Sequence, residues 1–310
     1  MDIFFALLTT IFFLIAVVIA NNMIATISNI TRSSMASKRN ALFLATFFAS
    51  LGFLFSGRKV MNTVSHKLFP FEPTTFLLAT IITSLLMFAG TFFEISVSVQ
   101  QVFLFALLGI YYSLGIPFHF FYLLKVFSLW ILNVVFVAVI VLITYKLLGR
   151  VINKISLTER AWFMKILSLA SSCILAYGLG ANTIGTLTSS LGKYAFSPLT
   201  VLGVIIVMWY GAYILGNMNR GKSRFREGFD FYSITCAQLG CGISLLLFTF
   251  AGIPLSIIYA MISSLLTIAF LKRIPILEKS IQKWVLKSTV VIPFIAFVLG
   301  ASLSLLLLNI

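Results

Sequence analysis

Two polar segments, far apart in an otherwise apolar chain, share a pattern that suits anion binding. Asn22 begins the sequence NMIATIS, and Asn182 begins the similar sequence NTIGTLT. A second polar element follows each at nearly the same distance, ISVS ending at Ser98 and IPLS ending at Ser256. The separations, 98 − 22 = 76 and 256 − 182 = 74 residues, indicate an internal duplication. Duplicated polar interruptions in an apolar chain are a good sequence pointer to the substrate site of a transporter.

The residue types in these segments suit hydrogen bonding to a small oxyanion. Pro254 lacks a backbone donor and fits the first turn of a helix, so Ser256 would lie in that turn. The exposed N–H groups and the positive dipole of a helix start favour an anion. Two such starts, facing each other across a pseudo-two-fold axis, would form a neutral cradle. The candidate substrate-binding residues are Asn22, Thr26, Ser98, Gln100, Gln101, Asn182, Thr186, Ser256 and Tyr259.

Each of these residues also has a purely structural interpretation. Asn, Ser and Thr commonly cap helix ends or form hydrogen bonds between membrane helices. Pro254 and Ser256 could form a turn at the membrane surface, and Tyr259 could simply pack. Glu94 is the only acid near these segments and is the candidate for binding a coupling cation, although it could equally lie among lipid headgroups. No catalytic residue, metal ligand or cofactor is predicted.

The elements that must position these residues are membrane helices. The chain is 61% hydrophobic and 9% charged, whereas a soluble domain usually carries about 25% charged residues. Apolar runs of roughly 18 residues or more recur from end to end and predict an all-α polytopic membrane protein. We draw ten segments, at 3–29, 40–57, 74–93, 95–113, 117–148, 161–190, 195–216, 229–251, 253–271 and 288–309. The segments at 95–113 and 253–271 could be re-entrant or broken.

The chain is strongly basic, with 22 Lys and Arg against 7 Asp and Glu and a formal charge of +15. The basic residues lie in short loops between apolar runs, where they orient a membrane protein and meet anionic lipid, so no nucleic-acid partner is expected. The basic loops at 30–39, 146–165, 217–228 and 272–287 should be cytoplasmic, and the basic segment 58–67 is an exception. We therefore predict a multi-pass protein of the plasma membrane with both termini on the non-cytoplasmic side.

The two halves of the chain should enter the membrane in opposite directions. Five segments fall in residues 1–150 and five in residues 151–310. Because an odd number of segments reverses the direction of the chain, the second copy must be upside down relative to the first. This is the inverted-topology repeat of many secondary transporters, whose site lies near the midplane between the repeats.

With these motifs in place, the chain resembles the inorganic phosphate transporter (PiT) family over most of its length. The sequence RNALFLA at 39–45 is similar to the family's first-half helix, and GIPLSIIYA at 252–260 resembles its G-x-P-V-S-T-T-H-A motif. The sequence ISVSVQQ at 95–101 is a weaker copy of that motif. The resemblance implies inverted repeats, both termini outside, and transport of phosphate, or of sulfate in relatives, with sodium or protons.

The chain departs from the family's repeated signature, G-x-N-D-x-x-N, because neither half has the aspartate. In one register the Asp position falls on Ile19 and Leu179, and in the other on Asn22 and Thr183. The Thr pair of the second motif is also replaced, by Val99-Gln100 and by Ile257-Ile258. The chain therefore looks like a divergent member that lacks the motif aspartates, and its sodium coupling is in doubt.

The predicted function is a permease for a small inorganic oxyanion, phosphate or sulfate, that works by alternating access. A transport-inactive sensor or scaffold is the alternative. A membrane-embedded enzyme is less favoured, because the sequence offers no nucleophile with a base and no cluster of acids or histidines at membrane depth. The expected partners are phosphate or sulfate, protons ahead of sodium as coupling ion, the lipid bilayer, and a second copy in a candidate homodimer.

Overall fold

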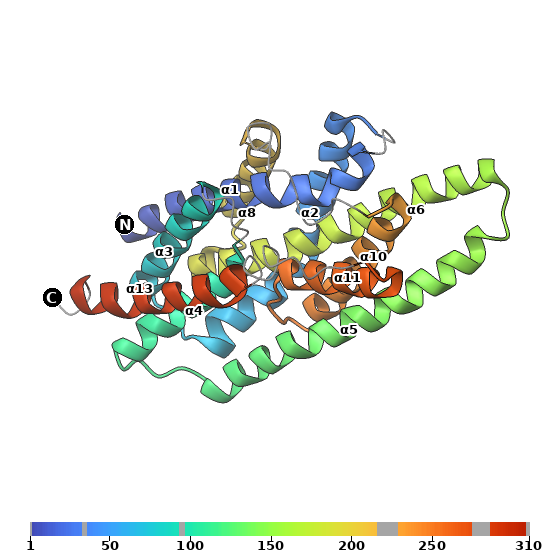
Figure 1. Cartoon of the computed structure of the whole chain (residues 1–310). Helices are drawn as coiled ribbons and strands as arrows, with labels where there is room; N and C mark the ends of the chain where they lie inside the picture. The colour runs from blue at the N-terminus through green and yellow to red at the C-terminus, as the bar shows by residue number, and fades with distance from the viewer. Residues whose placement is uncertain (1, 33–35, 93–96, 216–228, 275–285, 308–310) are drawn as a thin grey trace.

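The computed structural model describes residues 2–32, 36–92, 97–215, 229–274 and 286–307, and Figure 1 shows their arrangement. Every regular element in these ranges is a helix, and they contain no strand. Eight of the helices are long and apolar enough to cross a bilayer. The prediction of an all-α, multi-pass membrane protein is confirmed.

The structure describes five helical elements in each half of the chain. The first half contains α1 (Asp2–Arg32), α2 (Lys38–Asn62) continued by the π-helical η1 (Thr63–Leu68), α3 (Pro73–Phe92), α4 (Val99–Ser113) and α5 (Phe120–Ile152). The second half begins with α6 (Leu157–Gly178), η2 (Leu179–Ile184), α7 (Gly185–Thr188) and η3 (Ser189–Tyr194), which together form one long rod. It continues with α8 (Pro198–Tyr210) and η4 (Gly211–Leu215), α10 (Phe231–Phe250), α11 (Ile257–Lys272), and η6 (Lys287–Val291) with α13 (Ile292–Leu307).

The helix boundaries repeat between the halves. α3 and α10 both contain 20 residues and start 231 − 73 = 158 residues apart, and α4 and α11 start 257 − 99 = 158 residues apart. In Figure 1 the first half leads from the end of the molecule where α1 starts to the opposite end, where α5 joins α6, and the second half leads back. α1 therefore starts at the same end as α13 finishes, and the halves run in opposite directions, as inverted repeats do.

Two helices, α4 and α11, are too short to cross a membrane. They contain 15 and 16 residues, or about 22–24 Å of helix at 1.5 Å per residue, against about 30 Å of hydrocarbon. Each follows a longer helix that packs beside it, α3 for α4 and α10 for α11. The expectation that 95–113 and 253–271 are not simple spans is confirmed for the residues that the structure describes.

The largest error in the predicted boundaries lies at residues 58–67. The sequence placed a loop at 58–67, whereas the helix continues through α2 and η1 to Leu68. The helix tolerates its basic residues because their long side chains reach partners beyond it. The Arg58 guanidinium lies 5.8 Å from the Phe196 ring centre, and Lys59 Nζ donates to the Phe250 carbonyl oxygen at 3.4 Å.

Glycine allows α2 and the α6–η2 rod to touch backbone to backbone. A Cβ atom on Gly180 would overlap the Ala49 carbonyl oxygen, and one on Gly52 would overlap the Tyr177 carbonyl oxygen. Close approach over small residues is a common basis of helix association in membranes. The contact holds η2, which carries Asn182, against the other half of the protein.

Gly180→Val should destabilise the protein by about 3 kcal/mol, because overpacking against a backbone cannot be relieved by a side-chain rotation. The midpoint of thermal unfolding in detergent measures this effect. Gly149→Ala is the matched control, since its new Cβ would lie 3.3 Å from the Tyr232 hydroxyl, the far end of a side chain. An unchanged midpoint for Gly180→Val would contradict the close backbone contact.

Candidate anion-binding site

The starts of α4 and α11 meet inside the protein. The Ser98 hydroxyl donates to Ser256 Oγ at 2.8 Å, and both side chains are buried. The two serines are 158 residues apart, so they occupy equivalent positions in the two halves. Equivalent residues that touch must lie beside the pseudo-two-fold axis, which runs in the membrane plane for inverted repeats. The contact therefore belongs near the middle of the membrane, and the structure brings the predicted pair together.

Both helix starts direct backbone donors toward this contact. The first helical bonds are Val102 N to Ser98 O at 3.0 Å and Ala260 N to Ser256 O at 3.2 Å. Ser256 Oγ caps α11 by accepting from Tyr259 N at 3.3 Å, whereas the Ser98 side chain does not cap α4. The N–H groups of the first turns and the two helix dipoles thus converge on one point, an arrangement that favours an anion.

Asn182 holds the segment that leads into Ser256. Its amide nitrogen donates to Ile253 O and to Thr249 Oγ1, both at 2.9 Å, and its Oδ1 accepts from Leu255 N at 2.8 Å. Both amide protons are therefore used by the protein. The sequence suggested that Asn182 donates to a ligand, but in this conformation it positions the backbone of residues 253–255 instead.

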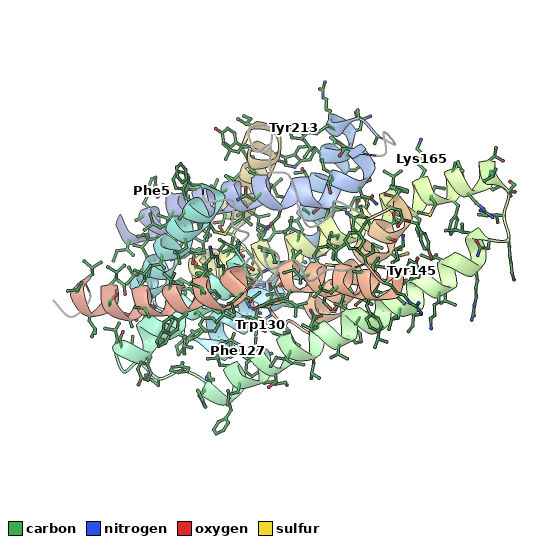
Figure 2. The ribbon with its side chains drawn as sticks, viewed as in Figure 1. Phe5, Phe127, Trp130, Tyr145, Lys165 and Tyr213 are labelled. Carbon is green, nitrogen blue, oxygen red and sulfur yellow. The ribbon has the colours of Figure 1, made fainter. Side chains whose placement is uncertain are left out.

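Trp130 holds the same segment from the other side, and sequence reasoning missed it. Its indole Nε1 donates to the Pro254 carbonyl oxygen at 2.7 Å. Figure 2 shows Trp130 on α5, which runs along one edge of the bundle. A buried Trp normally finds an acceptor for its N–H. No other feature of the sequence indicated that Trp130 contacts the segment before Ser256. Asn182 and Trp130 together satisfy two consecutive carbonyl oxygens that would otherwise repel an anion.

The two glutamines at the start of α4 occupy different surroundings. Gln100 Nε2 donates to Thr183 Oγ1 in η2 at 2.6 Å, which links the two halves again. Gln101 is buried, and its Oε1 has no hydrogen-bond partner among the described residues. The Gln101 side chain lies beside the Tyr259 hydroxyl, which donates to the Thr289 carbonyl oxygen at 2.9 Å. Tyr259 therefore packs against η6 and offers no free proton at the site.

The two threonines make the same local bond in each half. Thr26 Oγ1 donates to Asn22 O at 3.0 Å, and Thr186 Oγ1 donates to Asn182 O at 2.8 Å. The match supports the pairing of Asn22 with Asn182. Because both threonine hydroxyls donate to these carbonyl oxygens, neither proton is left for a ligand. The half-buried Asn22 side chain makes no hydrogen bond to a described residue.

The described part of the site carries no ionised side chain. Ser98, Ser256, Asn182, Gln100 and Gln101 are all neutral. The coupling candidate Glu94 lies outside the described residues. Within those residues no group of three His, Cys, Asp or Glu side chains could hold a metal ion. The site can therefore offer hydrogen-bond donors and helix dipoles to an anion.

Gly252 begins the turn into this site and has a φ of +72°, where L residues are strained. Gly252→Ala should cost about 1–2 kcal/mol from the backbone alone, and its Cβ would also lie 3.1 Å from the Lys59 carbonyl oxygen. Gly115→Ala is a matched control, because Gly115 has a φ of +66° with nothing within 4 Å. Thermal unfolding should show the larger loss for Gly252→Ala. Equal losses would mean that contact with Lys59 does not matter.

These features define an all-helical, polytopic membrane protein whose two halves meet at a candidate anion site, with no ionised side chain among the described residues of that site. No protein-family model matches the chain. A protein of Methanocaldococcus jannaschii, named a putative phosphate permease, is 26% identical over 289 residues, which are 93% of both chains. A solved structure named the sodium-dependent phosphate transporter covers 100% of both chains with a TM-score of 0.84 and 15% identity. The first comparison confirms the resemblance that the motifs predicted, and the second confirms the fold.

Proposed function

We propose that this chain is a secondary transporter, a permease for inorganic phosphate that works by alternating access between two inverted repeats, residues 1–150 and 151–310. The observation that carries the proposal is the contact between Ser98 and Ser256, where two helix starts meet across the two halves at 2.8 Å. The names of both relatives support phosphate as the substrate. Sulfate, which the sequence left open, has no such support.

The chemistry of the site suits a tetrahedral oxyanion. Phosphate needs several donors at once, and charge-assisted hydrogen bonds to it are worth about 1.5–3 kcal/mol each. The first N–H groups of α4 and α11 and the hydroxyls of Ser98 and Ser256 supply such donors from both halves. Phosphate would replace the direct bond between the two hydroxyls, so that each serine donates to a phosphate oxygen.

Alternating access then has a simple geometric basis. A ligand bound between equivalent residues of inverted repeats can be reached from either side when one repeat moves against the other. The Ser98–Ser256 and Gln100–Thr183 bonds join the repeats at the centre, and we propose that they break and form again as the site opens. We place the protein in the plasma membrane with both termini outside.

Coupling to sodium is not part of the proposal. The motif positions that carry Asp in the family are Ile19 and Leu179, or Asn22 and Thr183, and none of these side chains supplies a carboxylate for a cation. We propose proton coupling or uncoupled passage instead.

Uptake of radioactive phosphate into liposomes that contain the purified full chain tests the proposal. We expect saturable phosphate uptake that sulfate inhibits weakly and that persists when choline replaces sodium. A response of this uptake to an imposed pH gradient would distinguish proton coupling from uncoupled passage. Phosphate binding without uptake would favour a sensor or scaffold over a permease. Steep sodium dependence would overturn the coupling proposal and leave the permease standing.

A further inference from the structure

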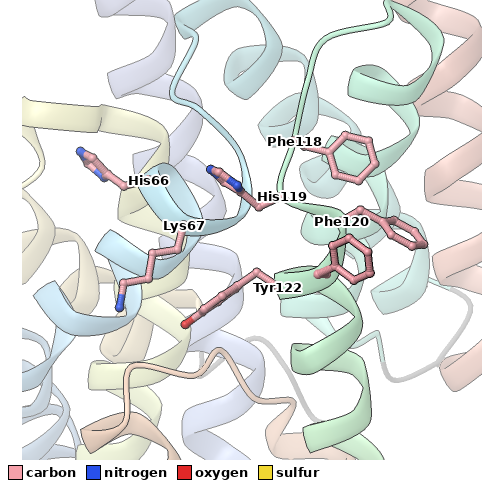
Figure 3. A pocket seen from close by; sticks show the side chains of 7 residues that line it. His66, Lys67, Phe118, His119, Phe120 and Tyr122 are labelled. Carbon is pink, nitrogen blue, oxygen red and sulfur yellow. The ribbon is translucent and has the colours of Figure 1, made fainter.

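A pocket separate from the central site lies where α5 begins. It has a volume of about 680 Å³ and is lined by His66, Lys67, Phe118, His119, Phe120, Phe121 and Tyr122 (Figure 3). None of these residues belongs to the central site. His66 and Lys67 come from η1, and the other five come from the start of α5 and the residues just before it.

The polar part of this pocket is basic. Lys67, His66 and His119 line it, and no acid is among its lining residues. Figure 3 shows Lys67 and the hydroxyl end of Tyr122 extending toward the same side. Lys125, one turn further along α5, adds a cation 5.7 Å from the centre of the Tyr122 ring. Ser65 Oγ donates to Met61 O at 3.0 Å, so the 2.8 Å contact between Ser65 Oγ and His66 Nδ1 uses the hydrogen on Nδ1 and orients that ring. The Lys67 ammonium, with the two histidines beside it, suits a phosphate group.

The apolar part of the pocket points to lipid. Phe120 is 52% exposed and Phe121 is 86% exposed, and both lie in the first turn of α5. Leu124, one turn further along the 33-residue helix α5, is also exposed and continues this apolar face. The start of such a span lies at the membrane–water interface, where headgroups meet hydrocarbon. A free inorganic anion would make no use of two exposed phenylalanines, whereas acyl chains would cover them.

We propose that this pocket binds an anionic phospholipid, with the headgroup phosphate at Lys67, His66 and His119 and an acyl chain over Phe120, Phe121 and Leu124. Basic pockets between membrane helices are a known means of holding such headgroups. The pocket joins η1 to α5, so a bound lipid would tie the end of the long α2–η1 rod to the start of α5. This assignment does not depend on what the central site transports.

Native mass spectrometry of the purified full chain tests the proposal, with phosphatidylglycerol and phosphatidylcholine offered at equal concentration. We expect a retained phosphatidylglycerol on the intact protein and about a fivefold to tenfold loss of its affinity in Lys67→Gln, in line with the contribution of one surface cation. His66→Gln with His119→Gln should lower it further. Lys165→Gln, an exposed lysine on α6, is the matched control and should change nothing.

Three other outcomes would overturn the assignment. Equal retention of both lipids would show that charge does not select the occupant. Unchanged phosphatidylglycerol binding in Lys67→Gln and in the double histidine variant would place the lipid elsewhere. Displacement of the lipid by millimolar inorganic phosphate, with phosphate itself then protecting Lys67 from amine labelling, would identify the occupant as the free anion. All these side chains are exposed, so thermal unfolding should confirm that the variants remain folded.

Discussion

Asn182→Ala should destabilise the protein strongly and abolish phosphate uptake. The substitution removes three hydrogen bonds at once, to Thr249 Oγ1, Ile253 O and Leu255 N. A buried backbone group left without a partner costs about 1–3 kcal/mol, so the loss of free energy of unfolding should reach about 3 kcal/mol or more. Because residues 253–255 lead into the cap of α11, the donors of that helix would also lose their position. Thermal unfolding and liposome uptake measure the two effects.

Two further variants make the test specific. Asn182→Asp keeps an acceptor for Leu255 N but cannot donate to Ile253 O, so it should also lose transport. Asn40→Ala removes an exposed asparagine at the start of α2 and should leave both stability and uptake unchanged. If Asn182→Ala unfolded at the temperature of the unaltered protein and bound phosphate more weakly, Asn182 would be a direct ligand instead of a positioning residue.

The duplication could be predicted from the sequence, because polar residues are conspicuous in a chain with so few of them. The structure refines its register. Ser98 and Ser256 are 158 residues apart, whereas Asn22 and Asn182 are 182 − 22 = 160 apart, so the two halves differ by two residues between these points. Short stretches of sequence were enough to detect the duplication, since each helix start is encoded locally.

The roles of individual side chains could not be predicted in the same way. Asn182 and Tyr259 both look like free donors in the sequence, but their protons are taken by Ile253 O and Thr289 O. Asn182 and Ile253 are 71 residues apart in the chain. Trp130 was missed for the same reason, since its acceptor at Pro254 is 124 residues away. Such partners are fixed by the packing of the two halves, which local patterns do not contain.

The end of α2 illustrates a second limit. Basic residues at 58–67 indicated a loop, since charges are costly inside a membrane helix. The helix nevertheless continues to Leu68, because Arg58 and Lys59 find Phe196 and Phe250 on neighbouring elements. Basic residues alone therefore do not mark where a helix stops.

A disulfide between positions 98 and 256 should stop transport in a reversible way. The hydroxyl oxygens of Ser98 and Ser256 are 2.8 Å apart, so the sulfurs of a Ser98→Cys/Ser256→Cys variant need to move little to form a bond of about 2.05 Å. That bond would join equivalent points of the two repeats at their pseudo-two-fold axis. If alternating access requires these points to separate, the cross-link must block it even though the protein remains folded.

The experiment requires a background in which Cys173, Cys236 and Cys241 are replaced by alanine. Intact mass should show the loss of two hydrogen atoms, whose electrons pass to the added oxidant. Phosphate uptake should fall by more than about tenfold, a change of at least about 1.4 kcal/mol in the barrier. A reductant should restore uptake in the same sample, which separates cross-linking from the loss of the two hydroxyls. Oxidation should not affect Ser98→Cys or Ser256→Cys alone. Undiminished uptake by a fully cross-linked protein would mean that the repeats do not part at these serines and that the substrate passes elsewhere.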